Sequence, residues 1–178
     1  MLKRVAIIGP ESTGKSWLAQ KLAAHYNTKV TDEYSRIYFK NREYNYTVDN
    51  LAEIAKGQLK YENDIANSCT DLIFCDTEFI VMKIWSQVVF NFVPDWIENQ
   101  IVNHTYNLYL LCNLDVDWEP DALRNNSHNR QYIYNLFVKE LGQNNFNYRV
   151  VKDIDDNRLE NAIKFVDELM NNELSLGM

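Results

Sequence analysis

Five short apolar runs divide the chain and are separated by longer segments in which polar and apolar residues mix. The runs lie at about residues 4–8, 29–31, 72–75, 107–112 and 148–151. Apolar runs of this length, bounded by polar turns, are typical of strands that are buried on both faces of a sheet. The run at 29–31 is the weakest of the five signals.

Between the runs, apolar residues recur at the spacing of an amphipathic helix. This spacing predicts helices over residues 16–26, 48–67, 95–103, 129–141 and 157–170. Pro94 precedes the third helix, and proline suits the first turn of a helix. Gly142 follows the fourth helix, where glycine commonly ends a helix. Asp155 and Asp156 are available as caps for the last one.

The alternation of strands and helices predicts an α/β fold with a mostly parallel sheet of about five strands and helices on both faces. The chain has 178 residues and contains no repeat or Pro/Gly/Ser-rich linker, so we expect a single domain over 1–178. In such folds, ligands bind at the carboxyl ends of the strands. The motifs described below each follow one of the predicted strands and should therefore meet at one edge of the sheet.

Charge and cysteine content narrow the range of partners. The net charge is −7 and no basic stripe is present, so we expect no nucleic-acid partner. No apolar stretch reaches the roughly 20 residues that a membrane span requires. The apolar run near the start of the sequence is too short for the apolar region and cleavage site of a signal peptide. Three isolated cysteines without a CxxC pair fit the reducing cytoplasm. The oligomeric state is left open.

The segment after the first predicted strand carries the strongest chemical signal. Residues 9–16 read GPESTGKS and match the P-loop pattern G-x-x-x-x-G-K-[ST] in full. Such a loop points its backbone N–H groups at phosphate oxygens next to the positive end of a helix. The pattern predicts a P-loop NTPase fold that binds the triphosphate of ATP or GTP. The predicted contacts are Gly9, Glu11, Ser12, Thr13, Gly14, Lys15 and Ser16.

A metal-binding position is expected at the end of the third predicted strand. The apolar run 72–75 is followed directly by Asp76, and in P-loop enzymes this carboxylate orients Mg²⁺ or its waters. The Ser16 hydroxyl is the second expected Mg²⁺ ligand. An aspartate that only caps a turn is the simpler alternative for Asp76, and the P-loop upstream argues against it.

The segment after the second strand supplies the groups that a phosphate acceptor needs. Asp32 or Glu33 could accept the proton of an attacking hydroxyl, and the sequence leaves the choice between them open. Arg36 could hold the phosphoryl group or the acceptor. The alternative is that these charges form only the solvated start of a helix.

A polar segment after the fourth strand is long enough to form a small lid over about residues 115–130. Its arginines, Arg124 and Arg130, would close on the phosphates and stabilise charge in the transition state. An ordinary surface loop with two solvated arginines is the alternative. Regulatory GTPases carry [NT]KxD and DxxG motifs, and neither follows the metal strand here. The missing motifs argue against a regulatory GTPase, and among the other P-loop proteins a small-molecule kinase fits the length of the chain best.

Several motifs together resemble the ribosylnicotinamide kinase domain of NadR-type proteins. These are GPESTGKS, DEYSR at 32–36, DTE at 76–78 with Trp85 beyond it, and DVDWEPDALR at 115–124. The resemblance covers about residues 3–160. It implies transfer of the γ-phosphate of ATP to nicotinamide riboside, which gives nicotinamide mononucleotide in NAD salvage.

Carried over by position, the resemblance implies functional roles for Glu33, Arg36, Asp76 and Arg124. The chain departs from the family at Glu78, where DTD is common, so the acidic side chain at this position is longer by one methylene. The adenylyltransferase and helix-turn-helix parts of full-length members have no counterpart in these residues.

Aromatic side chains could hold a nicotinamide ring, since a cationic ring also gains cation–π attraction. Trp85 is the first choice for this contact, and Tyr34 and Tyr38 are the second. Arg158 lies after the fifth strand, where P-loop kinases often contact the base, and is the candidate for adenine. Two alternatives to nicotinamide riboside remain: another nucleoside or metabolite as acceptor, or an ATPase module that drives a protein partner.

Overall fold

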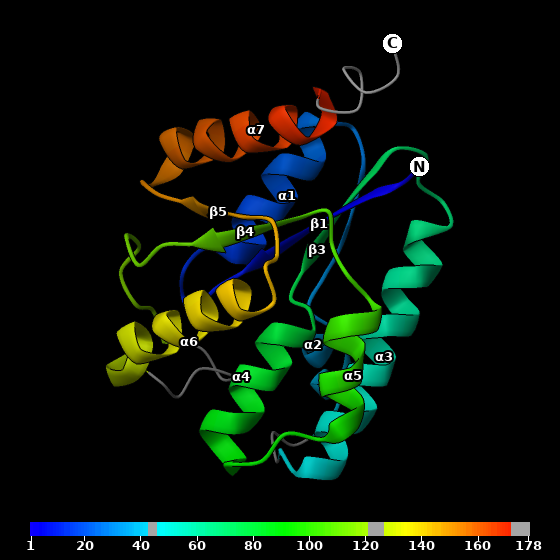
Figure 1. The fold of residues 1–178 in the computed structure, drawn as a ribbon, viewed down its shortest axis with the longest axis vertical. Coiled ribbons are helices and arrows are strands. Elements are labelled where there is room, and N and C mark those ends of the chain that lie inside the picture. Colours follow the sequence, from blue (N-terminus) through cyan, green and yellow to red (C-terminus); the bar gives the residue numbers. More distant parts are fainter. Residues whose placement is uncertain (43–45, 121–126, 172–178) are drawn as a thin grey trace.

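The computed structural model describes residues 1–42, 46–120 and 127–171 (Figure 1). Within them, five parallel strands form one sheet in the order β2-β3-β1-β4-β5. The strands are β1 (Lys3–Ile8), β2 (Lys29–Thr31), β3 (Leu72–Asp76), β4 (Leu108–Cys112) and β5 (Tyr148–Val151). All five strands and the α/β P-loop NTPase fold predicted from the sequence are confirmed.

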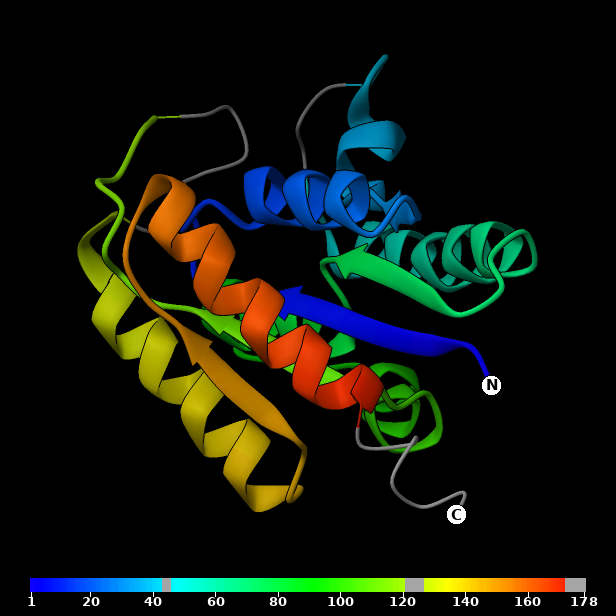
Figure 2. The same ribbon diagram turned by 90° about the horizontal axis from the view of Figure 1, so that it is seen from above.

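The helices cover both faces of this sheet. They are α1 (Lys15–His25), α2 (Tyr34–Phe39), α3 (Val48–Ala66), α4 (Phe79–Phe90), α5 (Asp95–Asn103), α6 (Arg130–Gln143) and α7 (Asp155–Asn171). A 3₁₀ turn at Ser127–Asn129 precedes α6. Helices α1 (blue) and α7 (orange to red) lie next to each other on one face, and α3 to α6 lie on the other (Figures 1 and 2).

Alternation along the strands divides the interior into two cores. In β1, Ala6 and Ile8 face the larger core with α3 to α6, whereas Val5 and Ile7 face the smaller core with α1 and α7. All four side chains are fully buried. This accounts for the unbroken apolar runs in the sequence, because a central parallel strand has a helix layer on each side.

Two helices were missed by the periodicity of the sequence. Helix α2 is only six residues long. Helix α4 is apolar over most of its circumference: Phe79, Ile80 and Met82 are buried, while Val81 and Trp85 line a pocket. A helix that packs on one side and lines a cavity on the other shows no polar stripe.

The predicted end of α6 was wrong. Gly142 lies inside the helix, which continues to Gln143 and is capped by Asn144. The left-handed residue that ends it is Asn145, with φ of 52°. The N–H of Phe146 then donates to the Leu141 carbonyl at 3.1 Å. Asp155 and Asp156 form the first turn of α7 instead of preceding it. No helix in the described part of the chain is long and apolar enough to cross a membrane.

Candidate active site

The loop between β1 and α1 has the backbone geometry of a phosphate cradle. Gly9 has φ of 140° and Gly14 has φ of 74°, values that side-chain-bearing residues rarely adopt. A Cβ at Gly9 would also lie 3.0 Å from the Cys112 carbonyl oxygen. Ser12, with φ of 56°, adds a third left-handed residue. The two motif glycines are therefore required by the backbone itself.

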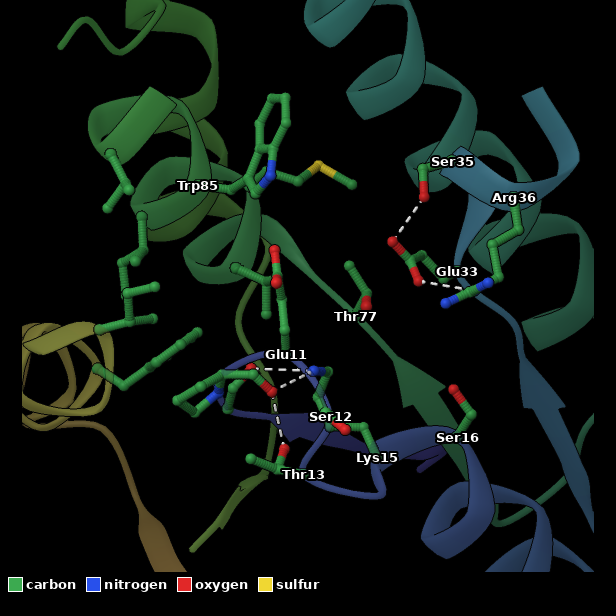
Figure 3. A pocket seen from close by; sticks show the side chains of 18 of the residues that line it. Glu11, Ser12, Thr13, Lys15, Ser16, Glu33, Ser35, Arg36, Thr77 and Trp85 are labelled. Atoms are coloured by element: carbon green, nitrogen blue, oxygen red, sulfur yellow. Dashed lines mark hydrogen bonds and ion pairs between the residues drawn. The ribbon is translucent and has the colours of Figure 1, made fainter. Parts of the chain in front are cut away.

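The amine of Lys15 lies inside this loop. Its Nζ donates to the carbonyl oxygens of Gly9 at 3.0 Å and Pro10 at 2.8 Å (Figure 3). The side chain thus points back across the cradle from the first turn of α1. This places a positive charge where phosphate oxygens would enter, so the predicted contact is geometrically available.

The loop is fastened to the start of the predicted lid. The Ser12 hydroxyl donates to the Asp117 carbonyl at 3.3 Å and accepts from the Glu119 N–H at 2.8 Å. Arg130 donates to the carbonyls of Ser12 at 3.1 Å and Val116 at 2.8 Å. Arg130 therefore lies beside the phosphate cradle. Arg124, the other predicted lid arginine, lies outside the described residues.

Asp76 ends β3 next to the cradle and is only 2% exposed. Burial raises its pKa to about 6, while the Lys15 ammonium and a hydrogen bond from Ser16 act in the opposite direction. Its Oδ1 is buried without a hydrogen-bond partner among the described residues. A buried carboxylate oxygen left in this way beside Ser16 fits a divalent cation that takes oxygen ligands.

The described side chains alone do not supply a complete metal cage. Within the described ranges, no group of three or more His, Cys, Asp or Glu side chains could hold a metal ion. Mg²⁺ typically keeps waters and phosphate oxygens and takes only one or two protein ligands. Ser16 and Asp76 therefore match a Mg²⁺ that arrives with a nucleotide.

Glu78, where the chain departs from the family pattern, has a structural role in this fold. Its carboxylate accepts from the N–H groups of Ile80 at 2.8 Å and Val81 at 3.2 Å and so caps α4. Burial raises the pKa of Glu78 to about 8, against the effect of these two amides. Within the described part of the chain, Glu78 is not among the residues that line the pocket.

Thr77, between Asp76 and Glu78, is a site residue that the sequence analysis missed. It has φ of 79°, an unfavourable conformation for a β-branched residue. Strained backbone of this kind tends to cluster at functional sites. Thr77 lines the pocket and lies between the P-loop and Glu33 (Figure 3). The DTE motif at 76–78 contains Thr77, but no residue pattern shows its strain, because the strain exists only in the folded turn.

The acidic pair after β2 is split by the fold. Glu33 lines the pocket; its carboxylate accepts from the Ser35 hydroxyl at 2.6 Å and from Arg36 Nε at 3.2 Å (Figure 3). Asp32 is exposed and accepts from Gln20 on α1 at 2.8 Å. Of the two candidate bases, only Glu33 is among the described residues of the pocket wall.

Beyond the cradle the pocket opens into an apolar chamber, and the whole cavity has a volume of about 270 Å³. Three helices, α3, α4 and α6, provide much of its wall. The apolar lining residues are Tyr46, Leu51, Ile54, Val81, Met82, Ile84, Trp85, Val88, Ile133 and Phe137.

Two aromatic rings lie close together in this chamber. The Trp85 and Tyr46 ring centroids are 4.3 Å apart. The Glu11 carboxylate, which the sequence analysis assigned to the nucleotide, points from the P-loop toward Trp85 (Figure 3). Tyr34 packs against Gly57 and Tyr61 and is not among the described lining residues. The chamber therefore brings a carboxylate and two aromatic rings together.

Arg158 is placed differently from the sequence expectation. The residue is 1% exposed, and its guanidinium donates to the carbonyls of Thr13 at 2.9 Å, Asp153 at 2.9 Å and Asn113 at 3.4 Å. It lies behind the P-loop and is not among the described residues of the pocket wall.

Comparison with known proteins gives a consistent result. A family model described as an AAA domain matches residues 4–158. The chain is 29% identical over 176 residues to the trifunctional NAD biosynthesis/regulator protein NadR of Salmonella typhimurium. That match covers 95% of this chain and 43% of the relative, so the chain spans less than half of the relative's length.

Solved structures share the fold. A NadR protein in complex with NR superposes with a TM-score of 0.81 at 22% identity, over 95% of this chain and 52% of that chain. A deoxyadenosine kinase from M. mycoides superposes with a TM-score of 0.63 at 16% identity, over 93% of this chain and 99% of that one. The resemblance to NadR-type kinase domains inferred from the motifs is confirmed.

Proposed function

We propose that this chain, which belongs to the AAA domain family through a match over residues 4–158, is an ATP- and Mg²⁺-dependent kinase of a small hydroxylated acceptor. The observation that carries this proposal is the continuity of the pocket. The phosphate cradle, the Glu33 carboxylate and the aromatic chamber line a single cavity. A γ-phosphate at Lys15 and a ring near Trp85 would place an acceptor hydroxyl between them.

The chemistry is a direct transfer. The acceptor oxygen bonds to the γ-phosphorus of ATP, the bond to the ADP oxygen breaks, and the acceptor proton passes to Glu33. Phosphoryl transfer depends mainly on position and charge, which this chain supplies through Lys15 and the P-loop amides. Ser16 and Asp76 would hold Mg²⁺, which supplies charge neutralisation at the phosphates when bound. Arg130 lies where it can add positive charge from the lid.

Nicotinamide riboside is the acceptor that we propose. The relative from Salmonella typhimurium is named as an NAD biosynthesis protein, and the solved NadR protein holds NR. In this chain, Trp85 and Tyr46 line the cavity with their ring centroids 4.3 Å apart, and the Glu11 carboxylate points toward Trp85. A cationic pyridinium would gain from both features.

We also propose a cytoplasmic location, which the free thiols of all three cysteines support.

Product detection by mass tests the proposal. The purified protein is incubated with Mg²⁺, ATP and nicotinamide riboside, with a panel of deoxynucleosides run in parallel. We expect nicotinamide mononucleotide from wild type and none from the Lys15→Ala variant. Product from a deoxynucleoside alone would favour the rival acceptor that the deoxyadenosine kinase fold suggests.

ATP binding without any phosphorylated product would reject the kinase proposal. The alternative would then be an ATPase module that acts on a protein partner, and its rate of ATP hydrolysis should rise when that partner is added.

A further inference from the structure

Arg158 is a buried cation whose partners are all neutral. Its three hydrogen bonds go to backbone carbonyls, and no carboxylate lies within ion-pair distance of it among the described residues. We propose that Arg158 is the positioning residue of the P-loop: it fixes the Thr13 carbonyl from behind, and its unpaired charge favours a bound polyphosphate in front. This inference rests on phosphate binding by the loop and not on the identity of the acceptor.

The first part of the argument is geometric. A P-loop can point its N–H groups at phosphate only if the carbonyls of the same peptides point away from it, and buried carbonyls need donors. The Thr13 side chain is fully buried, and its hydroxyl already donates to Pro10 at 2.8 Å. Arg158 supplies the donor for the outward-facing carbonyl of Thr13 at 2.9 Å.

The guanidinium also joins three separate segments. Besides the P-loop it holds the carbonyl of Asn113, just after β4, and that of Asp153, just after β5. Asp153 has φ of 68°, a left-handed conformation, and its side chain is held by Asn161 at 3.1 Å. Only a planar group with several N–H donors can reach three carbonyls in different directions, so lysine is a poor replacement.

The second part is electrostatic. A buried charge that is not paired with an opposite charge is costly to the fold, because carbonyl dipoles replace only part of its hydration. A polyphosphate in the cradle lies on the far side of the Thr13 peptide and supplies the missing negative charge. Interactions of this kind are stronger in the low-dielectric interior than in water. Arg158 therefore contributes to anion affinity without touching the anion.

Calorimetric binding of inorganic tripolyphosphate, which has no base, separates this role from an adenine contact. We expect Arg158→Met to weaken tripolyphosphate and ATP by the same factor, about tenfold to a hundredfold, as for loss of hydrogen bonds to a charged group. Arg158→Lys should recover part of the loss because it keeps the charge. Arg149→Met, which removes a half-exposed arginine on β5, is the matched control and should change neither affinity.

A loss confined to ATP would overturn the proposal and restore the base contact, and unchanged affinity for both ligands would overturn it as well. If Arg158→Met does not fold, Arg158→Lys alone decides, since the proposal requires an equal loss for both ligands. In turnover assays, the lysine variant should raise the KM for ATP and leave the KM for the acceptor unchanged. Tripolyphosphate binding that depends on Arg158 would stand even if no acceptor were phosphorylated.

Discussion

The phosphate half of the pocket is made by eight consecutive residues. The apolar half collects side chains from Tyr46 and from three helices, α3, α4 and α6, which are far apart in the sequence. In the proposed function the cradle would bind through backbone N–H groups, so its design is local and tolerates little change at Gly9 or Gly14. The chamber would bind through the shape of its side chains. The cradle would then suit many acceptors, and the chamber would decide which acceptor fits.

The largest effect is expected in the cradle. Lys15→Ala should lower kcat by about 10²- to 10³-fold, because the amine that balances developing phosphate charge is lost. Turnover with Mg²⁺-ATP and the preferred acceptor measures it. Lys60→Ala, on the exposed face of α3, is the control and should be neutral. Near-normal turnover in Lys15→Ala would contradict the assigned role of the cradle.

The boundary between the two halves should give the next effect. Glu33→Gln removes the proton acceptor at nearly constant shape, and we expect kcat to fall about 100-fold. Asp32→Asn should stay within a fewfold of wild type, because Asp32 points to Gln20 on the outer surface. A larger loss in Asp32→Asn than in Glu33→Gln, measured as kcat at saturating acceptor, would reverse the assignment.

In the chamber, a change should affect the acceptor alone. Trp85→Ala is expected to raise the KM for a nucleoside acceptor about 10- to 30-fold, since a stacking face and its cation–π attraction are lost. The calorimetric affinity for ATP should stay constant, because Trp85 belongs to α4 and not to the P-loop. An equal loss of ATP affinity would show that the two halves are not separable.

The smallest effect is expected where α3, which forms part of the chamber wall, packs against Tyr34 at the start of α2. A Cβ at Gly57 would lie 2.1 Å from Cε1 of Tyr34, so Gly57→Ala must displace the ring beside Glu33. After the gain in helix propensity is counted, we expect a loss of about 1 kcal/mol in the free energy of unfolding and a higher acceptor KM.

Gly142→Ala is the matched control for that variant. It is a helical glycine with nothing within 4 Å of the added Cβ, and it should stabilise the protein by about 0.5–1 kcal/mol. Denaturant unfolding measures both. Stabilisation of the two variants by the same amount would mean that Tyr34 moves freely.

The phosphate cradle could be predicted from the sequence, whereas the apolar chamber could not. The strands, the P-loop and Asp76 were predictable because each depends on a short segment and its immediate neighbours. The wall of the chamber was not, because Leu51, Val81 and Phe137 are ordinary apolar residues until three helices meet. Helix α4 was missed for the same reason, since its inward faces serve both core and cavity.

Two arginines show the limit most clearly. Arg130 and Arg158 were both expected near the nucleotide, and both prove to donate to P-loop carbonyls, at Ser12 and Thr13. Residue type predicted positive charge near phosphate, but it did not predict that both guanidinium groups would bond carbonyls of the loop, nor that neither would be among the described residues that line the pocket. Glu78 likewise looked like a variation in the metal site and became a helix cap.

By itself, the sequence determined the order of elements, the parallel sheet and the phosphate cradle, because burial patterns and glycine requirements act over a few residues. The tertiary structure alone decided that Glu33 and not Asp32 lines the pocket, that Thr77 is strained, and that Arg158 donates to the Thr13 carbonyl. Those outcomes depend on which surfaces meet when distant segments pack, and a linear pattern does not contain that information.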